Sequence, residues 1–311
     1  MRAAIDVGTN TVRLLLGETA EGRVIPERYL RRITRLGGGL TPEGALSDEA
    51  MERTLVALAG FADELRRQPP DSLRAVGTEA LRAAANGGAF AALVRAETGI
   101  PLEIIDGEEE ARLSALGVLS ALSARPGSCL IFDIGGGSTE FILCADAKPL
   151  FHRSYPLGVV RLCEDDASVA SQQQRIDTRL DGLFAELSAA GLLKVIERPD
   201  CLVVGTAGTV TTLAALHLGM TRYDWRRVNN HILPLADLRQ FLATLSPLTA
   251  EQREALPGME QGRGDLIVPG LRIVMAILSR LARREMVVSD FGLLEGVLLC
   301  EPAAGVPPTS R

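Results

Sequence analysis

The chain contains very little lysine, few aromatic residues and no long apolar run. Only two of its 33 basic residues are lysine, and aromatic residues make up 4% of the sequence. No stretch reaches the roughly 18 apolar residues that a membrane helix needs. The N-terminal "MRAAIDVGTN" enters a structured pattern at once, without the apolar region of a signal peptide. We therefore expect a cytoplasmic protein that does not interact with membranes.

Cysteine and histidine are also scarce, and their spacing excludes several kinds of site. The five cysteines are widely spaced and form no CxxC motif, which argues against disulfides and zinc. Free cysteines of this kind are usually small buried residues. The three histidines are scattered and form no recognisable triad or metal cluster. A carboxylate is therefore the expected base for activating water.

The composition is that of a globular protein, and the net charge argues against nucleic acid as the main partner. The 311 residues carry a net charge of −6, with 47% hydrophobic and 23% charged residues. This composition and length fit an ordinary soluble globular protein of roughly two domains. An acidic total argues against a nucleic-acid partner. The arginines of "RYLRRITR" (28 to 35) could face a polyanion, but solvent is the commoner environment for such a group.

Two parts of the chain resemble each other. "AIDVGTNTVR" and "IFDIGGGSTEF" both give a strand, an aspartate (Asp6, Asp133), a small polar loop and a second strand. Farther along, "VGTEAL" and "VGTAGT" each place a Gly-Thr pair between a strand and a helix. The spacing from aspartate to threonine, Asp6 to Thr78 and Asp133 to Thr206, differs by a single residue. This agreement predicts a duplicated α/β domain, with the best boundary at "ARPGS" (124 to 128).

The glycine-rich loops favour phosphate binding. A strand that ends in Gly-Gly-Gly-Ser-Thr presents backbone N–H groups to a phosphate oxygen, although a lone GGG is more often a tight hairpin. Asp133 beside such a loop would repel phosphate unless a cation such as Mg²⁺ lay between them. Asp6 is its counterpart in the first half, and Glu140 could reach the same ion or point to solvent. Loops at the strand ends of two α/β halves can converge on one cleft.

The segment "EIIDGEEEARLSALG" is a further site candidate. Acidic residues in the first turn of a helix are favoured by the helix dipole, and neighbouring positions point in directions about 100° apart. At most one or two of Glu108, Glu109 and Glu110 can therefore face a site, and periodicity alone does not choose between them. "QGRGD" (261 to 265) is interpreted as a turn and a helix cap.

Taken in order, these motifs resemble the Ppx/GppA phosphatases, which comprise exopolyphosphatases and guanosine pentaphosphate phosphohydrolases. The residues that carry the resemblance are "AIDVGTNTVRLLL", "RLGGGL", "VGTEALRAAAN", "EIIDGEEEARL", "FDIGGGSTEF", "YPLGVVRL", "GTAGT" and "VSDFGLLEGVLL". The resemblance implies an α/β protein with two duplicated ribonuclease-H-like domains of the actin-like ATPase superfamily and an interdomain cleft. Domain I would comprise residues 1–124 with the returning segment 292–311, and domain II residues 125–291.

The resemblance also implies roles for individual residues. Glu110, directly before Ala-Arg, would be the general base, with Arg82 as a second catalytic residue. Asp133, Glu140 and Asp6 would lie near Mg²⁺ or another divalent cation. The residues implied in phosphate binding are Thr9, Asn10, Thr11, Arg82, Gly135, Gly136, Gly137, Ser138, Thr206, Gly208 and Thr209.

Three departures from the pattern leave questions open. Asp106 stands where serine or threonine is commoner, and would either raise the pKa of Glu110 or cap the helix. Asn229 and Asn230 replace a usual His-Gly pair, so the role of that loop is open. The chain stops at residue 311, without the C-terminal helical domain of longer exopolyphosphatases. Long-chain polyphosphate would then lack part of its binding channel.

The expected activity is release of the terminal phosphate of polyphosphate, or of the 5′ γ-phosphate of guanosine pentaphosphate, by in-line attack of water. The sequence does not rank these two substrates. One alternative is an ATPase or small-molecule kinase with the same phosphate loops, and another is a non-catalytic sensor of polyphosphate or alarmone. The oligomeric state is left open, with a homodimer among the candidates.

Overall fold

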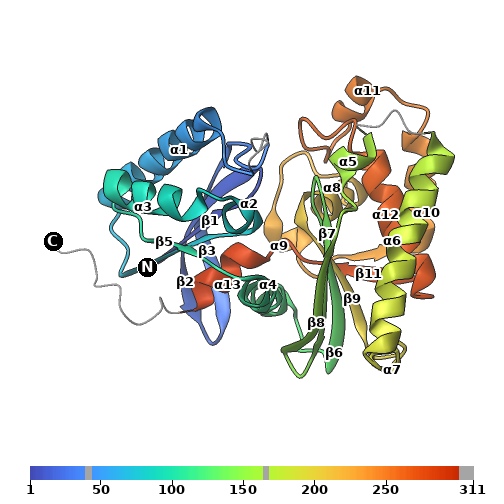
Figure 1. The fold of residues 1–311 in the computed structure, drawn as a ribbon. Helices are drawn as coiled ribbons and strands as arrows, with labels where there is room; N and C mark the ends of the chain where they lie inside the picture. Colours follow the sequence, from blue (N-terminus) through green and yellow to red (C-terminus); the bar gives the residue numbers. More distant parts are fainter. Residues whose placement is uncertain (39–43, 164–167, 301–311) are drawn as a thin grey trace. The chain divides into compact units, whose positions relative to one another are not determined.

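The structure, a computed structural model, describes residues 1–38, 44–163 and 168–300 (Figure 1). The chain forms two compact units. Unit 1 contains Met1–Ser120 and the segment that begins at Gly292, and unit 2 is Ala121–Phe291. Each unit is built around one mixed sheet, with strands β1 to β5 in unit 1 and β6 to β11 in unit 2.

Unit 1 has a five-stranded sheet in the order β3-β2-β1-β4-β5. Strand β1 pairs with β2 antiparallel and with β4 parallel, and β4 pairs with β5 parallel. The elements are β1 (Arg2–Val7), β2 (Thr11–Ala20), β3 (Arg23–Ile33), α1 (Asp48–Arg67), β4 (Ser72–Gly77), α2 (Glu79–Ala83), α3 (Gly87–Thr98), β5 (Leu102–Ile104), α4 (Gly107–Ala121) and α13 (Leu293–Leu299).

Alternation along β1 places the core residues of unit 1 on one face of the sheet and Asp6 on the other. Ala3, Ile5 and Val7 pack in one cluster with Phe61 of α1 and Phe90 of α3. Because successive strand residues point to opposite faces, Asp6 lies on the other face of the sheet. The same alternation that builds the core therefore directs the carboxylate away from α1 and α3.

Helix α13 returns to unit 1 and packs closely against α4 and the sheet (Figure 1). A Cβ on Gly296 would overlap the carbonyl oxygen of Leu113, and one on Gly117 would overlap that of Gly292. Only glycine permits this approach of the two backbones. The Tyr29 hydroxyl donates to Oε1 of the buried Glu295 at 2.8 Å, which ties α13 to β3.

Unit 2 has a six-stranded sheet in the order β10-β11-β9-β6-β7-β8. Its core lies between this sheet and helices that include α6, α8 and α12, and contains Phe132, Phe141, Leu180 and Leu271. The elements are β6 (Ser128–Ile134), β7 (Thr139–Ala145), β8 (Lys148–Tyr155), α5 (Val159–Cys163), α6 (Val169–Ala189), α7 (Leu193–Ile196), β9 (Leu202–Thr206), α8 (Ala207–His217), α9 (Trp225–Val228), β10 (Ile232–Pro234), α10 (Leu235–Leu245), α11 (Ala250–Glu254), α12 (Ile267–Arg280) and β11 (Glu285–Val288).

The two sheets repeat one topology. The order β3-β2-β1-β4-β5 of unit 1 corresponds to β8-β7-β6-β9-β11 of unit 2, and β10 is added at the edge. In each unit the first two strands form an antiparallel hairpin, and the next strand pairs in parallel with the first. The duplicated ribonuclease-H-like α/β fold predicted from the sequence is thus confirmed.

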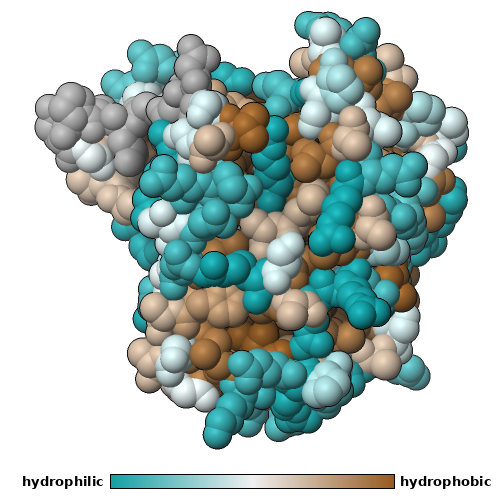
Figure 2. Space-filling model, turned by 90° about the vertical axis from the view of Figure 1, so that its right-hand side faces the viewer, coloured by the Kyte–Doolittle hydropathy of each residue, from teal (hydrophilic) through white to brown (hydrophobic). Residues whose placement is uncertain are grey.

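The visible surface carries hydrophilic residues over much of its area, with hydrophobic residues between them (Figure 2). Within the described residues, no helix is both long enough and apolar enough to cross a membrane.

Candidate functional site

The first turn of α4 is shaped by Asp106. Its Oδ1 accepts from the backbone N of Glu109 at 2.8 Å, and its carbonyl accepts from the N of Glu110 at 3.0 Å. A side-chain acceptor at this position satisfies an N–H group that the helix itself leaves without a partner. Of the two roles left open by the sequence, the structure shows that Asp106 caps the helix.

Glu110 lies beside Arg82 in this first turn. Arg82, at the end of α2, donates through Nη1 to the carbonyl of Ile105 at 2.8 Å and to Oε2 of Glu110 at 3.1 Å. The side chains of Arg82 and Glu110 keep 34% and 27% of their surface exposed. The expected base and the expected phosphate-binding arginine therefore occupy adjacent, accessible positions.

Glu109 has different partners. Its Oε2 accepts from Nε of Arg112 at 2.7 Å, and its Oε1 accepts from Nη2 of the buried Arg74 at 3.0 Å. The hydrogen bond from Arg112, and with it that from Arg74, lowers the pKa of Glu109. A carboxylate held by two guanidinium groups is poorly suited to accept a proton. Both oxygens of Glu109 are therefore bound by guanidinium groups.

Asp6 in unit 1 is bound by an arginine. Arg13 stands directly opposite Asp6 in the β1–β2 register, and its Nε and Nη2 lie 3.0 and 2.6 Å from Oδ2. Asp6 is 3% exposed. Its Oδ1 is buried and has no hydrogen-bond partner among the described residues. Arg13 therefore binds one carboxylate oxygen of Asp6, and the other oxygen could bind a cation or a donor outside the described residues.

The loop after Asp6 is held by the segment that follows β3. Gly8 N donates to the carbonyl of Thr11 at 3.0 Å and closes the loop. The carbonyl of Asn10 accepts from the backbone N of residues 34 and 35, and that of Thr9 accepts from Gly37 at 2.8 Å. Thr9 and Thr11 are partly exposed and Asn10 is exposed. The three residues expected to contact phosphate thus lie together, Thr9 and Asn10 on the loop and Thr11 at the start of β2, on a backbone held by hydrogen bonds.

In unit 2 the corresponding positions carry two carboxylates. Asp133 and Glu140 stand opposite each other in the β6–β7 register. Directly opposite residues share one face of a sheet, with Cβ atoms about 4.5 to 5.5 Å apart. The same row continues to Thr206 on β9 and to Ser154 on β8, whose hydroxyl donates to Oε1 of Glu140 at 2.6 Å. The structure therefore brings Asp133, Glu140 and Thr206 together.

The Gly-Gly-Gly loop turns its carbonyl groups toward α5. The carbonyl of Gly135 accepts from Val159 at 3.1 Å, and that of Gly136 accepts from Val160 at 2.9 Å. A Cβ on Gly158 would overlap Gly136, so the loop and the start of α5 are in close contact. The N–H groups of Gly136 and Gly137 donate to no other described residue. They are therefore free to bind an anion.

The third loop lies at the start of α8. Thr206 precedes the helix, and its hydroxyl donates to the carbonyl of Phe291 at 3.1 Å. The guanidinium of Arg263 lies against Gly208, because a Cβ on this glycine would overlap it. Arg263 is ion-paired with Glu260 and its side chain is 20% exposed. A guanidinium at a helix N-terminus adds a cation to a place that already favours anions.

Sequence reasoning missed Arg263, which lies in the "QGRGD" segment interpreted as a turn and cap. The turn is present, since Arg263 N donates to the carbonyl of Glu260 at 3.2 Å. No local pattern links this turn to a loop some 55 residues earlier, so only the tertiary structure places the guanidinium there.

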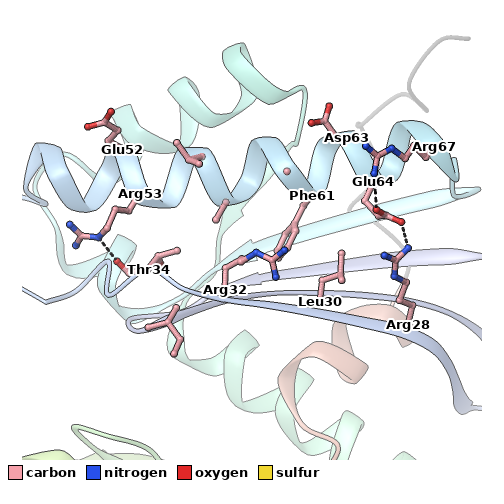
Figure 3. Close-up of a pocket in the computed structure, with 14 residues that line it drawn as sticks. Arg28, Leu30, Arg32, Thr34, Glu52, Arg53, Phe61, Asp63, Glu64 and Arg67 are labelled. Carbon is pink, nitrogen blue, oxygen red and sulfur yellow. Dashed lines mark hydrogen bonds and ion pairs between the residues drawn. The ribbon is translucent and has the colours of Figure 1, made fainter. Parts of the chain in front are cut away.

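A separate pocket of about 670 Å³ lies between β3 and α1 (Figure 3). Glu64 forms ion pairs with both Arg28 and Arg67 at one end, and Arg53 donates to the carbonyl of Thr34 at the other. None of the residues that line it belongs to the predicted site. Arg28 of the "RYLRRITR" group thus pairs with an acidic residue in this pocket.

The duplicated sheets, with glycine- and threonine-containing loops after their first strands, have the actin-like ATPase fold that the sequence predicted. The sequence pattern of the Ppx/GppA phosphatase family matches residues 25–302. Exopolyphosphatase 2 of Mycobacterium tuberculosis is 33% identical over 322 aligned residues, which cover 96% of this chain and 97% of that protein.

Solved structures of Ppx/GppA phosphatases and exopolyphosphatases have the same fold as this chain. A Ppx/GppA phosphatase from Aquifex aeolicus superimposes with a TM-score of 0.80 at 29% identity, covering 96% of this chain and 98% of that one. An exopolyphosphatase from Cytophaga hutchinsonii gives a TM-score of 0.79 at 27% identity, with 96% of each chain covered. The chain belongs to the Ppx/GppA phosphatase family, as the motifs predicted. It is a phosphohydrolase that acts on phosphoric anhydrides.

Proposed function

We propose that this protein is a Mg²⁺-dependent exopolyphosphatase that releases the terminal phosphate of inorganic polyphosphate. We propose that it also hydrolyses guanosine pentaphosphate by releasing its 5′ γ-phosphate. The observation that carries the proposal is the contact between Arg82 and Glu110 at the start of α4, 3.1 Å long. An arginine that binds a terminal phosphate there brings the phosphorus next to a carboxylate base. The similarity to an exopolyphosphatase supports polyphosphate as the first substrate to test.

In this mechanism Glu110 accepts a proton from water while the water oxygen attacks the terminal phosphorus in line. The P–O bond to the rest of the chain breaks, and its oxygen keeps the electron pair. Arg82 binds oxygens of the terminal phosphate, and charge-assisted bonds of this kind are strong and directional. Backbone N–H groups of Gly136 and Gly137, and the loop at Thr206, bind further phosphates of the chain.

The carboxylates of unit 2 fit Mg²⁺. Asp133 and Glu140 are neighbours on one face of the sheet. The described residues contain no group of three or more His, Cys, Asp or Glu side chains suited to holding a metal. Mg²⁺ is usually bound by one or two carboxylates together with waters and substrate phosphates, so a pair is sufficient. When bound, the ion would neutralise phosphate charge. Asp6 is a third candidate through its buried Oδ1.

The test is phosphate release in the presence of Mg²⁺ from short polyphosphate, long polyphosphate, guanosine pentaphosphate and ATP, measured side by side. We expect polyphosphate or guanosine pentaphosphate to be hydrolysed well above ATP. ATP hydrolysis at a comparable or higher rate would favour the alternative of an actin-like ATPase. Binding without turnover of any substrate would favour the sensor alternative.

A further inference from the structure

The side chain of Asn230 forms two hydrogen bonds with the backbone at the start of unit 2. Its backbone is left-handed, with φ at 65°, a conformation that asparagine tolerates better than most residues. Its Oδ1 accepts from Ser123 N at 2.7 Å, and its Nδ2 donates to the carbonyl of Ala121 at 2.7 Å. Ala121 is the last residue of α4 and the first residue of unit 2. Glycine would fit this backbone, but it would make neither bond.

The side chain of Asn229 forms a hydrogen bond with the backbone at the end of unit 2. Its Oδ1 accepts from the backbone N of Asp290 at 2.7 Å. The next residue, Phe291, is the last of unit 2, and its carbonyl accepts from the hydroxyl of Thr206. The Nδ2 of Asn229 is buried without a partner among the described residues. Such a group costs desolvation free energy, so the stabilising contact of Asn229 is the one that its Oδ1 makes with Asp290.

The two asparagines therefore act at both places where the chain crosses between the units. The crossings are Ser120 to Ala121 and Phe291 to Gly292. One crossing is the C-terminal end of α4, the helix whose first turn carries Glu110. The other crossing is next to the carbonyl that holds Thr206 in its loop.

We propose that Asn229 and Asn230 are positioning residues for hydrolysis: Asn230 fixes the C-terminal end of α4, the helix that carries Glu110, and Asn229 fixes the segment whose Phe291 carbonyl holds Thr206. This inference rests on the proposed function, because the positioned groups are the base and a phosphate-binding loop. It assigns a role to the pair that replaces the His-Gly expected from the family pattern.

The contacts themselves are tested by hydrogen exchange. Asn230→Gly keeps a left-handed backbone and removes the side chain, so exchange of the Ser123 amide should become roughly tenfold faster, the factor that one ordinary hydrogen bond corresponds to. Asn229→Ala should do the same for the Asp290 amide. Ala282→Gly is the matched control, since Ala282 is also left-handed, with φ at 51°, and is exposed. Unchanged exchange at Ser123 in Asn230→Gly would overturn the contact.

The positioning role is tested by kinetics with short polyphosphate and Mg²⁺. We expect kcat of Asn230→Gly to fall roughly tenfold with KM within about twofold, because an interaction that orients the base affects turnover more than binding. Asn230→Asp keeps the acceptor for Ser123 N and should recover part of the loss. Wild-type kcat in Asn230→Gly, despite faster exchange, would overturn the inference alone. A wild-type protein that hydrolyses none of the substrates would instead overturn the proposed function, and the exchange data would still decide whether the contacts exist.

Discussion

A methyl group at Gly208 should remove Arg263 from the phosphate loop without unfolding the protein. A Cβ at this position would overlap the guanidinium of Arg263, which is the mobile end of a long side chain and not backbone. Gly208 is in the first turn of α8 and is not among the glycines with positive φ. Gly208→Ala therefore leaves the helix intact and forces the guanidinium to move.

The size of the effect follows from what the guanidinium contributes. A hydrogen bond to a charged group is worth about 1.5 to 3 kcal/mol. At about 1.4 kcal/mol for each factor of ten, loss of one such bond to substrate raises KM roughly tenfold to hundredfold. Alanine is favoured over glycine inside a helix by up to about 1 kcal/mol, so the free energy of unfolding should not fall.

The assay is steady-state phosphate release from short polyphosphate, with thermal unfolding as the control for folding. Arg263→Gln should raise KM by a similar factor, because it removes the same group. The double variant should then be no worse than either single one, since two changes that remove one interaction are not additive. Wild-type KM in Gly208→Ala, or additive losses in the double variant, would show that Arg263 does not contact substrate.

Three further changes test other parts of the site. Glu110→Gln should lower kcat by about a hundredfold or more while substrate still binds, as measured by turnover and equilibrium binding; wild-type turnover would move the base elsewhere. Asp133→Asn should raise the Mg²⁺ concentration needed for half-maximal activity, and an unchanged Mg²⁺ titration would contradict a metal role. Burial, and with it the charges of His217 and Arg227, lowers the pKa of His231 from 6.5. The unfolded chain then binds a proton that the folded protein does not, so the melting temperature should fall as pH decreases below about 6.5, and less so in His231→Gln.

Much of the fold could be predicted because the signals are local and occur twice. An aspartate at a strand end, a small polar loop and a Gly-Thr pair before a helix recur with nearly constant spacing. Each of these features depends only on neighbouring residues, such as the glycines of the hairpin loop. The cap that Asp106 gives to α4 is local in the same sense. The returning helix α13 is a different case. Its packing on α4 depends on Gly117 and Gly296, which lie far apart in the chain, and only the family resemblance predicted it.

The candidate site was less predictable where it depends on tertiary contacts. Arg263 reaches the α8 loop from a distant turn, and Arg74 holds Glu109 from the middle of β4. Neither contact leaves a pattern in the sequence, because the two partners belong to separate motifs. The choice between Glu109 and Glu110 therefore rests on the resemblance, since both carboxylates accept hydrogen bonds from arginine side chains.

The partners of the two aspartates could have been predicted from the hairpins, and they distinguish the two halves. In both hairpins the residue opposite the aspartate lies seven positions later, which gives Arg13 for Asp6 and Glu140 for Asp133. A guanidinium opposite a carboxylate neutralises it, whereas two carboxylates opposite each other form a pair that can bind a cation. Duplication thus preserved the backbone while the residue opposite each aspartate changed. We therefore expect the Mg²⁺ dependence to rest chiefly on Asp133 and Glu140 of unit 2, and less on Asp6, because one oxygen of Asp6 is already bound by Arg13.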